Sequence, residues 1–184
     1  GHRHGPTRGP RGDALIEQRE RIMMIQPRNK VTPFLWFNNN AEAAANFYVS
    51  LFADSKIVDV ARWSKGTHFP EGSVMSVTFD LAGQEYIAFN GGPHFVLNEA
   101  LSLFVNCEDQ HEVDHYWNAL LADGGEASHC GWLKDRFGVT WQIVPKAMGR
   151  ALSDPDSARA GRAMEAIMKM VKLDVAAIEA ALRA

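Results

Sequence analysis

The segment ALSLFVNCEDQHEVDHYWNALL, residues 100–121, contains the pattern that decides the fold. Its first part is apolar and rich in β-prone residues, which predicts a strand over residues 100–107. Asp109 and Glu112 follow at the spacing of a helix capping box. The next apolar residues recur at intervals of three and four, as on one face of an amphipathic helix; they are Val113, Tyr116, Trp117, Leu120 and Leu121. The segment therefore predicts a strand followed directly by a helix.

The same order occurs earlier in the chain. A strand is predicted for VTPFLWF (31–37), a capping box for Asn39 and Glu42, and a helix for the stripe Ala44, Phe47, Tyr48, Leu51 and Phe52. Three strand-like segments follow each helix, at 55–63, 73–81 and 85–90 in the first copy and at 125–130, 131–136 and 139–145 in the second. The sequence therefore predicts an α+β fold of two tandem βαβββ modules.

The ends of the chain differ from the two modules in composition. The start is rich in Gly, Pro, Arg and His and mostly lacks periodicity, which is typical of a disordered leader or a tag. Near the other end, a helical stripe runs from Ala160 to Val171, and Asp174 can cap a last helix. These helices need an apolar surface, either the back of the sheet or a second copy of the chain. The expected domains are a leader or tag at 1–28, paired modules at 29–146 (29–93 and 98–146) and a C-terminal helical extension at 147–184.

Composition and charge narrow the classes of function. The chain has 184 residues, 46% of them apolar and 22% charged, with a net charge of −3. This balance argues against nucleic acid as the partner, because phosphate binding needs a basic surface. No apolar run approaches the roughly 20 residues of a membrane span, so no membrane partner is expected. The two cysteines, Cys107 and Cys130, fit a reducing compartment and predict a cytoplasmic protein.

Several runs of the sequence resemble one known superfamily. Asp135 to Ile143 (DRFGVTWQI) is similar to the closing segment of the vicinal oxygen chelate superfamily, the glyoxalase and bleomycin-resistance fold, with Gln142 in place of its metal-binding glutamate. The chain more closely resembles the PhnB-like branch, whose domain is often labelled a 3-demethylubiquinone-9 3-methyltransferase domain. This resemblance extends from Asn29 to about Ala184, and its motifs are TPFLWF, FYVSLF, FNGG, LFVNCEDQ, CGWLKDRFGVTWQIVP and KLDVAAIEAA.

The resemblance implies that each module curls into half of an open cup of mixed sheet around a pocket. The metal-ligand positions of the superfamily match Thr32, Ser102 and Gln142, with a fourth position near Ala88. Of these, only Gln142 has a side chain that can serve as a ligand. A stable divalent site usually needs three or four His, carboxylate or thiolate groups. We therefore predict no metal and no cofactor at the site of the superfamily.

Side chains of the same strand parity are expected to line the pocket. Aromatic walls with a few amides and hydroxyls suit a neutral, partly apolar small molecule. The alternative is that these residues fill a core, as inward aromatic side chains commonly do. The ligand-binding candidates are Thr32, Phe34, Trp36, Asn90, Ser102, Phe104, Asn106, Cys130, Trp132 and Gln142, with Thr140 beside them. No catalytic residue is assigned.

Two other motifs suggest different chemistry. His111 to His115 (HEVDH) matches the HExxH signature of zinc proteases. On the predicted helix, however, both histidines lie about 160° from Val113 in the apolar stripe, so they face solvent and we reject a zinc site. Cys130 lies near Lys134 and could be a nucleophile with a lowered thiol pKa. A small packing residue is the favoured interpretation of Cys130.

Three classes of function follow. The first is a binding protein or sequestering dimer that holds a small organic molecule without a metal. The second is a metal-dependent lyase or dioxygenase of the glyoxalase type, and the third is a structural role in which dimerisation is the purpose. Methyl transfer is not favoured, because no glycine-rich turn joins a strand to a helix as in Rossmann-type cofactor binding. A homodimer is expected, since half-cup sheets leave edges that must be covered. Whether the protein catalyses a reaction stays open.

Overall fold

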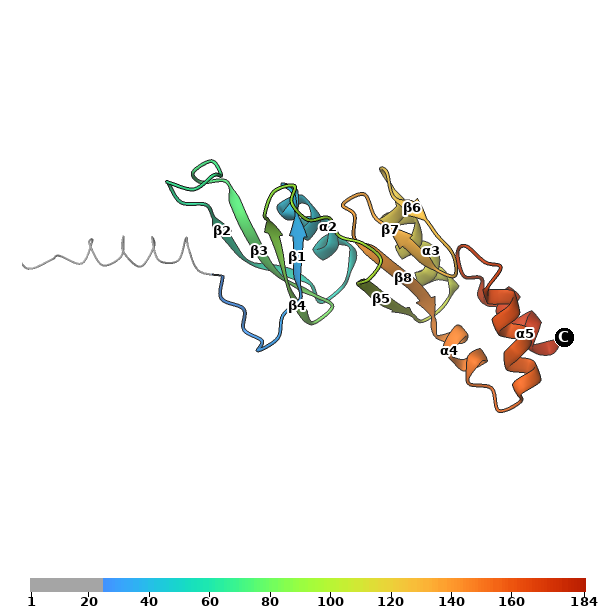
Figure 1. Ribbon diagram of the computed structural model, residues 1–184. Coiled ribbons are helices and arrows are strands. Elements are labelled where there is room, and N and C mark those ends of the chain that lie inside the picture. The colour runs from blue at the N-terminus through green and yellow to red at the C-terminus, as the bar shows by residue number, and fades with distance from the viewer. Residues whose placement is uncertain (1–24) are drawn as a thin grey trace, which may run out of the picture. The chain divides into compact units, whose positions relative to one another are not determined.

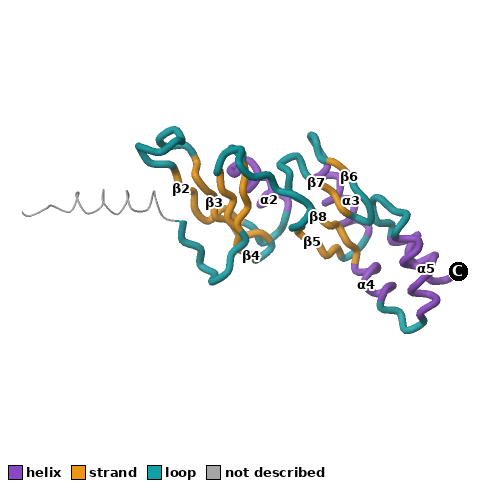
Figure 2. Tube along the Cα trace, viewed as in Figure 1, coloured by secondary structure: helices purple, strands orange, loops and turns teal. Residues whose placement is uncertain are grey.

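The computed structural model describes residues 25–184, and most of the expected leader lies outside the described residues. The chain divides between Phe95 and Val96 into two compact units. Each unit contains one four-stranded sheet and its own helices (Figures 1 and 2). Within residues 25–184, no helix has the length and apolar character needed to cross a membrane.

The first unit is a complete βαβββ module. Its elements are β1 (Phe34–Phe37), α2 (Ala41–Leu51), β2 (Lys56–Arg62), β3 (Val74–Leu81) and β4 (Gln84–Asn90). The strand order is β1-β4-β3-β2, in which β1 is parallel to β4 and the other pairs are antiparallel. After β1 the chain passes through α2, β2 and β3, and β4 then returns to pair with β1.

The second unit repeats this arrangement and adds three helices. Its module consists of β5 (Ser102–Cys107), α3 (Gln110–Leu121), β6 (Glu126–Ala127), β7 (Trp132–Lys134) and β8 (Thr140–Pro145), in the order β5-β8-β7-β6. The extension consists of α4 (Lys146–Leu152), α5 (Ser157–Ile167) and α6 (Val175–Arg183). The predicted tandem βαβββ fold of the α+β class is therefore confirmed. Helix α4 was not predicted, because its seven residues include Gly149 and show no stripe of their own.

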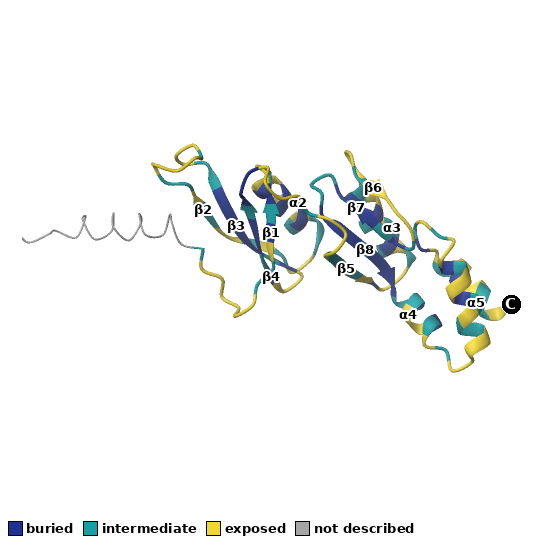
Figure 3. Ribbon diagram, in the orientation of Figure 1, coloured by how far each residue is buried: buried dark blue, intermediate teal, exposed yellow. Residues whose placement is uncertain are grey.

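The helix of each module packs against its sheet, and many residues of the strands are buried (Figure 3). In the first unit, α2 contacts β3 and β4, and the strand residues on that side include Leu35, Val77 and Phe79. In the second unit, α3 contacts β7 and β8, where Leu133 and Trp141 are buried. Period-two alternation then directs the intervening residues to the opposite, open face of each sheet.

The surface of α3 agrees with the rejection of a zinc-protease site. Val113, Trp117 and Leu120 are the buried residues of this helix, while His111 and His115 are exposed. The helix begins as its capping spacing predicts, because the Asp109 side chain accepts a hydrogen bond from the backbone N–H of Glu112 at 3.0 Å. The two histidines therefore belong to a solvated face.

The start of α2 differs from the predicted capping box. The helix begins at Ala41 after Asn40, and neither Asn39 nor Asn40 caps it. Instead, Asn90 at the end of β4 accepts a hydrogen bond from the backbone N–H of Ala41 at 2.9 Å. The cap thus comes from a distant strand, so local spacing could not reveal it.

The C-terminal helices pack on the sheet of their own unit. Val144 of β8 and the half-buried Cys130 belong to the apolar cluster that α4, α5 and α6 form with Leu173. The backbone N–H groups of Cys130 and Gly131 donate to the carbonyls of Met170 and Val171 at 2.9 and 2.8 Å. The extension therefore covers one end of the open face of the second sheet. Its last helix is capped by Asp174, as predicted.

Candidate functional site

The open face of the second sheet presents side chains in rows across the strands. Residues paired in the register of a sheet point to the same face. The first row contains Ser102, Thr140, Lys134 and Glu126, and the second contains Phe104, Gln142 and Trp132. The sequence prediction that Ser102, Phe104, Trp132 and Gln142 share one face is consistent with this register. Beyond the second row, Val144 is covered by the C-terminal helices.

Gln142 is the central polar group of the second row. Its Nε2 donates to the Ser102 hydroxyl at 3.0 Å, while its Oε1 has no hydrogen-bond partner among residues 25–184. The register places Phe104 on one side of Gln142 and Trp132 on the other. Phe104 is 58% exposed although it is a large apolar side chain. The row therefore combines two aromatic rings with an amide oxygen that can accept a hydrogen bond.

A hollow of about 200 Å³ lies beside these rows in the second unit. Lys134 Nζ contacts Glu99 Oε1 at 2.7 Å on its rim, and this hydrogen bond raises the pKa of Lys134 and lowers the pKa of Glu99. The lining residues are Glu99, Glu126, Ala127, Ser128, Trp132, Leu133, Lys134 and Thr140. The Oγ1 of Thr140 is buried without a partner in the described part of the chain. The hollow thus combines apolar lining from Ala127, Trp132 and Leu133 with a polar rim.

The other two candidates of the second unit lie away from this hollow. Cys130 has a positive φ of 56°, and its Sγ donates to the carbonyl of Ile167 at 3.4 Å. Its thiol therefore contacts the end of α5, which agrees with a packing residue. Asn106 is exposed and pairs in register with Val144, at the end of the sheet that the extension covers.

On the open face of the first unit, Phe34 and Trp36 lie on either side of Phe89. The Phe89 ring centroid is 5.1 Å from that of Phe34 and 5.1 Å from that of Trp36. Trp36 Nε1 donates to the carbonyl of Gly92 at 2.9 Å. A Cβ on Gly91 would come within 2.2 Å of the Trp36 ring, so the glycine of the FNGG motif allows the indole to lie against the backbone.

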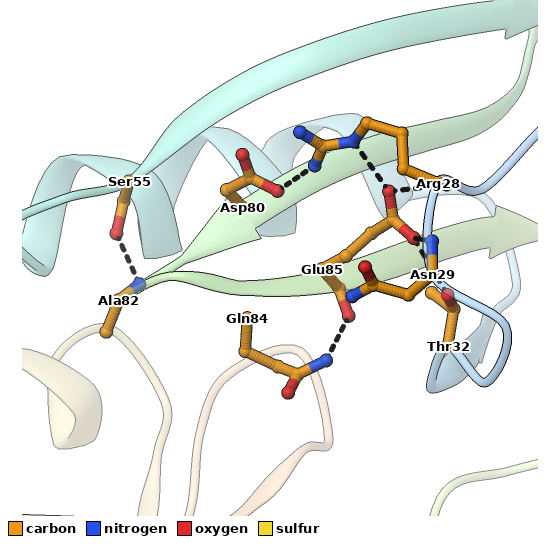
Figure 4. Close-up of polar contacts among 8 residues, drawn as sticks. All are labelled: Arg28, Asn29, Thr32, Ser55, Asp80, Ala82, Gln84 and Glu85. Carbon is orange, nitrogen blue, oxygen red and sulfur yellow. Dashed lines mark hydrogen bonds and ion pairs between the residues drawn. The ribbon is translucent and has the colours of Figure 1, made fainter.

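Thr32, the remaining candidate of the first unit, lies just before β1 and is held by Glu85 (Figure 4). The Glu85 carboxylate accepts hydrogen bonds from the Thr32 hydroxyl at 2.8 Å and from the backbone N–H groups of Arg28 and Asn29, each at 3.0 Å. These backbone hydrogen bonds lower the pKa of Glu85 to about 2, although the residue is buried. Arg28, which was expected in the leader, therefore belongs to the folded unit.

Two positions on β4 differ from the sequence-based assignment. Asn90 was expected to line the pocket, but its side chain caps α2 and donates to the carbonyl of Val74 at 3.1 Å. Ala88, the fourth metal-ligand position, is fully buried and pairs with Leu35 on the side of the helix. Ile87 and Phe89 are the β4 residues on the open face, because they pair in register with Phe34 and Trp36. The side-chain alternation along β4 is therefore offset by one residue from the alternation that the sequence-based assignment assumed.

The residues at the superfamily's metal position do not fit a divalent ion. Thr32 and Ser102 offer hydroxyls that are already hydrogen-bonded to Glu85 and Gln142, and Gln142 offers one amide oxygen. Over the described ranges, no group of three or more His, Cys, Asp and Glu side chains could hold a metal ion.

Sequence reasoning missed several residues of the open faces. Glu85 and Phe89 share the parity of Ile87 on β4, so a correct choice of parity would have found them. Lys134 shares the parity of Trp132 on its strand and lies within the motif CGWLKDRFGVTWQIVP. Trp63 ends the strand predicted over residues 55–63 and lies just after β2, whereas Phe69 lies in the connection between β2 and β3, outside any periodic segment; no sequence signal placed either residue on this face.

Comparisons with known proteins agree with the geometry. The family model described as 3-demethylubiquinone-9 3-methyltransferase matches residues 29–144. A PhnB protein from Bacillus cereus is 36% identical, with a TM-score of 0.58 and a match that covers 64% of this chain and 99% of that one. A protein from Pseudomonas aeruginosa is 20% identical over 64% of this chain and 97% of its own, and its TM-score of 0.52 supports the fold alone. No match was found among curated proteins.

The match includes both modules and ends before α4, so the C-terminal helices lie beyond the family model. The chain therefore belongs to the 3-demethylubiquinone-9 3-methyltransferase family, the PhnB-like branch of the vicinal oxygen chelate superfamily.

Proposed function

We propose that the protein binds a small, partly apolar organic molecule on the open faces of its sheets, without a metal. The observation that supports this most strongly is the row Phe104, Gln142 and Trp132, in which an amide oxygen without a hydrogen-bond partner among residues 25–184 lies between two aromatic rings. Ligand sites commonly combine apolar walls with a few polar groups that orient the ligand. The adjacent hollow of about 200 Å³ offers room for part of such a molecule.

Metal chemistry is not part of the proposal. Zinc, nickel and iron sites use His, carboxylate or thiolate ligands, which the candidate positions do not supply. Gln142 is the one side chain there with a suitable oxygen, and its amide already donates to Ser102. A lyase or dioxygenase of the glyoxalase type would need metal ligands from residues other than these candidates.

Methyl transfer, which the family description names, is not proposed either. Rossmann-type cofactor sites use a parallel sheet and a helix N-terminus with free N–H groups. Here β2, β3 and β4 are antiparallel, and the Ala41 N–H at the start of α2 already donates to Asn90. These features support binding over methyl transfer.

The proposal includes a cytoplasmic homodimer. Its support is the strand order, which leaves β1 and β2 at the edges of one sheet and β5 and β6 at the edges of the other. Exposed edge strands are usually paired or covered, and twofold symmetry is the commonest solution in soluble oligomers. The two cysteines are free, as in proteins of reducing compartments.

A fragment screen by thermal shift tests the binding function. We expect at least one aromatic fragment to raise the Tm and to lose affinity in Gln142→Ala and Trp132→Ala by about 1–3 kcal/mol, the cost of leaving a polar partner unmatched or of losing an apolar wall. Asn118→Ala, an exposed change on α3, is the matched control and should leave binding unchanged. Full retention of affinity in both site variants would contradict the assignment.

Metal analysis of the protein, purified without chelators, tests the proposal that the site holds no metal. We expect no stoichiometric nickel, zinc or iron. About one equivalent of such a metal per chain, lost in Gln142→Ala, would overturn the metal-free proposal.

A further inference from the structure

We propose that the hollow of the second unit binds an aromatic monocarboxylate, whose carboxylate replaces Glu99 on Lys134 and accepts a hydrogen bond from the Thr140 hydroxyl. The inference rests on the proposed binding function and names the chemical class of the ligand. It is based on two neighbouring groups of one sheet face. One is a lysine that already holds a carboxylate, and the other is a buried hydroxyl without a partner among residues 25–184.

Thr140 carries an unsatisfied polar group in the lining of the hollow. The residue is 3% exposed, and its Oγ1 has no hydrogen-bond partner in the described part of the chain. By contrast, the hydroxyl of Ser102, the next residue of the same row, accepts a hydrogen bond from Gln142 at 3.0 Å. Buried hydroxyls usually have a partner, and an exception in a native fold needs an explanation. A ligand oxygen that accepts from Thr140 would supply one.

Lys134 is the neighbour of Thr140 on the open face. The two residues pair in register across β7 and β8, so their side chains leave the same face of the sheet. The Cβ atoms of directly opposed residues are about 4.5–5.5 Å apart, and the lysine stem is flexible. A single carboxylate can therefore accept from the ammonium group of Lys134 through one oxygen and from the Thr140 hydroxyl through the other.

Glu99 demonstrates that a carboxylate reaches Lys134 in this place. Its Oε1 lies 2.7 Å from Lys134 Nζ, and the glutamate side chain is 66% exposed. Glu99 precedes β5 and belongs to no strand or helix. Ion pairs this exposed contribute little to stability, so a ligand carboxylate can displace Glu99 into solvent at small cost. Its departure frees space in the hollow that Thr140 also lines.

The charges around the hollow favour a ligand with one negative charge. Glu126 pairs in register with Lys134 from the opposite side, so the charged lining residues are Glu99, Glu126 and Lys134, with a net charge of −1. A monocarboxylate that replaces Glu99 keeps this balance, whereas a dianion adds negative charge. An ammonium ligand could pair with Glu126, but two strand spacings, about 9–10 Å, separate Glu126 from Thr140. Such a ligand would leave the buried hydroxyl unmatched.

Trp132 determines what the rest of the ligand must be. It lies two residues before Lys134 on β7, on the same face and about 7 Å away along the strand. Its side chain contributes apolar lining to the hollow. A flat ring attached directly to the carboxylate can extend along the strand from Lys134 and contact the indole, and contacts between aromatic rings are favourable. The site thus fits an aryl carboxylate.

The test compares 2-naphthoate with 2-naphthamide, a matched control that keeps the ring and a carbonyl but lacks the charge. A third probe, 2-naphthylmethylamine, represents the cationic class. Isothermal titration calorimetry of the full chain measures the three affinities. We expect 2-naphthoate to bind about tenfold more tightly than 2-naphthamide, as for a hydrogen bond to a charged group. The amine should bind no more tightly than the amide.

Two variants of the proposed donors test the contacts of the carboxylate. Lys134→Met keeps most of the stem and removes the charge, so the preference for 2-naphthoate over 2-naphthamide should disappear. Thr140→Val keeps the shape and removes the hydroxyl, so 2-naphthoate should bind about three- to tenfold more weakly. The Tm of the free Thr140→Val protein should stay the same or rise, because an unmatched buried hydroxyl is lost. Weaker binding by a protein of equal or higher stability cannot result from unfolding.

A third variant tests the competition with the loop carboxylate. Glu99→Gln removes the charge that holds Lys134, so 2-naphthoate should bind severalfold more tightly. Glu165→Gln is the matched control, because it removes a carboxylate from the exposed pair of Glu165 with Lys169 on the C-terminal helices. It changes the net charge by the same amount and should leave all three affinities unchanged.

The outcomes distinguish this inference from the proposed function. Equal affinity for 2-naphthoate and 2-naphthamide, tighter binding of the amine, a preference that survives Lys134→Met, unchanged binding in Thr140→Val, or weaker binding in Glu99→Gln would overturn the inference. If the amide binds as tightly as 2-naphthoate and both lose affinity in Trp132→Ala, the inference fails and the proposed function stands. If no fragment in the thermal-shift screen binds, the proposed function itself fails.

Discussion

At the scale of single residues, Glu85 shows how one buried carboxylate can fix the entry of the chain into the fold. It is 1% exposed and accepts hydrogen bonds from Arg28, Asn29 and Thr32, which together lead into β1. Hydrogen bonds to the charged form lower a carboxyl pKa, and here they outweigh the opposing effect of burial. Glu85 thus positions the strand that carries Phe34 and Trp36.

The lowered pKa of Glu85 predicts an acid-dependent loss of stability. Because the pKa falls from 4.5 to about 2 on folding, the stabilisation is complete above pH 4.5 and is lost as the pH falls towards 2. Glu85→Gln should lower the Tm by several degrees at pH 7, and the difference from wild type should shrink between pH 4.5 and 2. Thermal melts across this range measure it, with the exposed Glu179→Gln as control. A constant difference would contradict the assignment.

Gly91 provides a steric test of the position of Trp36. Gly91→Ala should destabilise the fold by about 1–3 kcal/mol, the typical cost of overpacking, because the new Cβ meets the indole at 2.2 Å. Chemical denaturation measures the loss, and a shift in tryptophan emission should accompany it. Gly161→Ala on α5, where a Cβ meets nothing within 4 Å, should instead stabilise by up to about 1 kcal/mol. Equal effects of the two changes would place Trp36 elsewhere.

At the scale of elements, α2 depends on a cap from β4. Asn90→Ala leaves the Ala41 N–H without its acceptor and should lower the free energy of unfolding by about 1–3 kcal/mol. Asn39→Ala, at the residue that local spacing selects, should change it by less than about 0.5 kcal/mol. Urea unfolding of both variants distinguishes the two caps. A larger loss in Asn39→Ala would restore the capping box.

Periodicity predicts those elements whose apolar pattern is complete within their own stretch of sequence. The stripe of α3 and the alternation of β8 follow from their own sequence, and both lie close to the expected residues. By contrast, β6 has two residues and exists through its pairing with β7, so its sequence gave little signal. Helix α4 is too short to show a repeat, and contacts with the other C-terminal helices stabilise it.

The candidate site was partly predictable for the same reason. Parity within one strand correctly groups Phe34 with Trp36 on the open face of the first sheet and Thr140 with Gln142 on that of the second. Parity between strands depends on register, which the sequence does not specify, so Asn90 was assigned to the wrong face of β4. The stack of Phe69 on Trp63 depends on a loop conformation and was out of reach.

At the scale of the whole molecule, the remaining question is how the sheet edges are satisfied. The strand orders leave outer edges at β1 and β5, each a strand that ends the parallel side of its sheet. Backbone donors and acceptors on such edges pair with another strand or attract a second chain. Phe104 on β5 is 58% exposed, which adds apolar area next to one of these edges.

A homodimer follows if a second copy covers these edges. Light scattering at micromolar concentration should then give a molar mass about twice the 20.4 kDa of one chain. Phe104→Asp should shift the equilibrium towards the monomer if β5 lies at the interface, because the interface would then bury a carboxylate. Asn118→Asp on the exposed surface of α3 adds the same charge and should leave the dimer intact. A single monomeric species in the wild type would mean that the edges are covered within one chain.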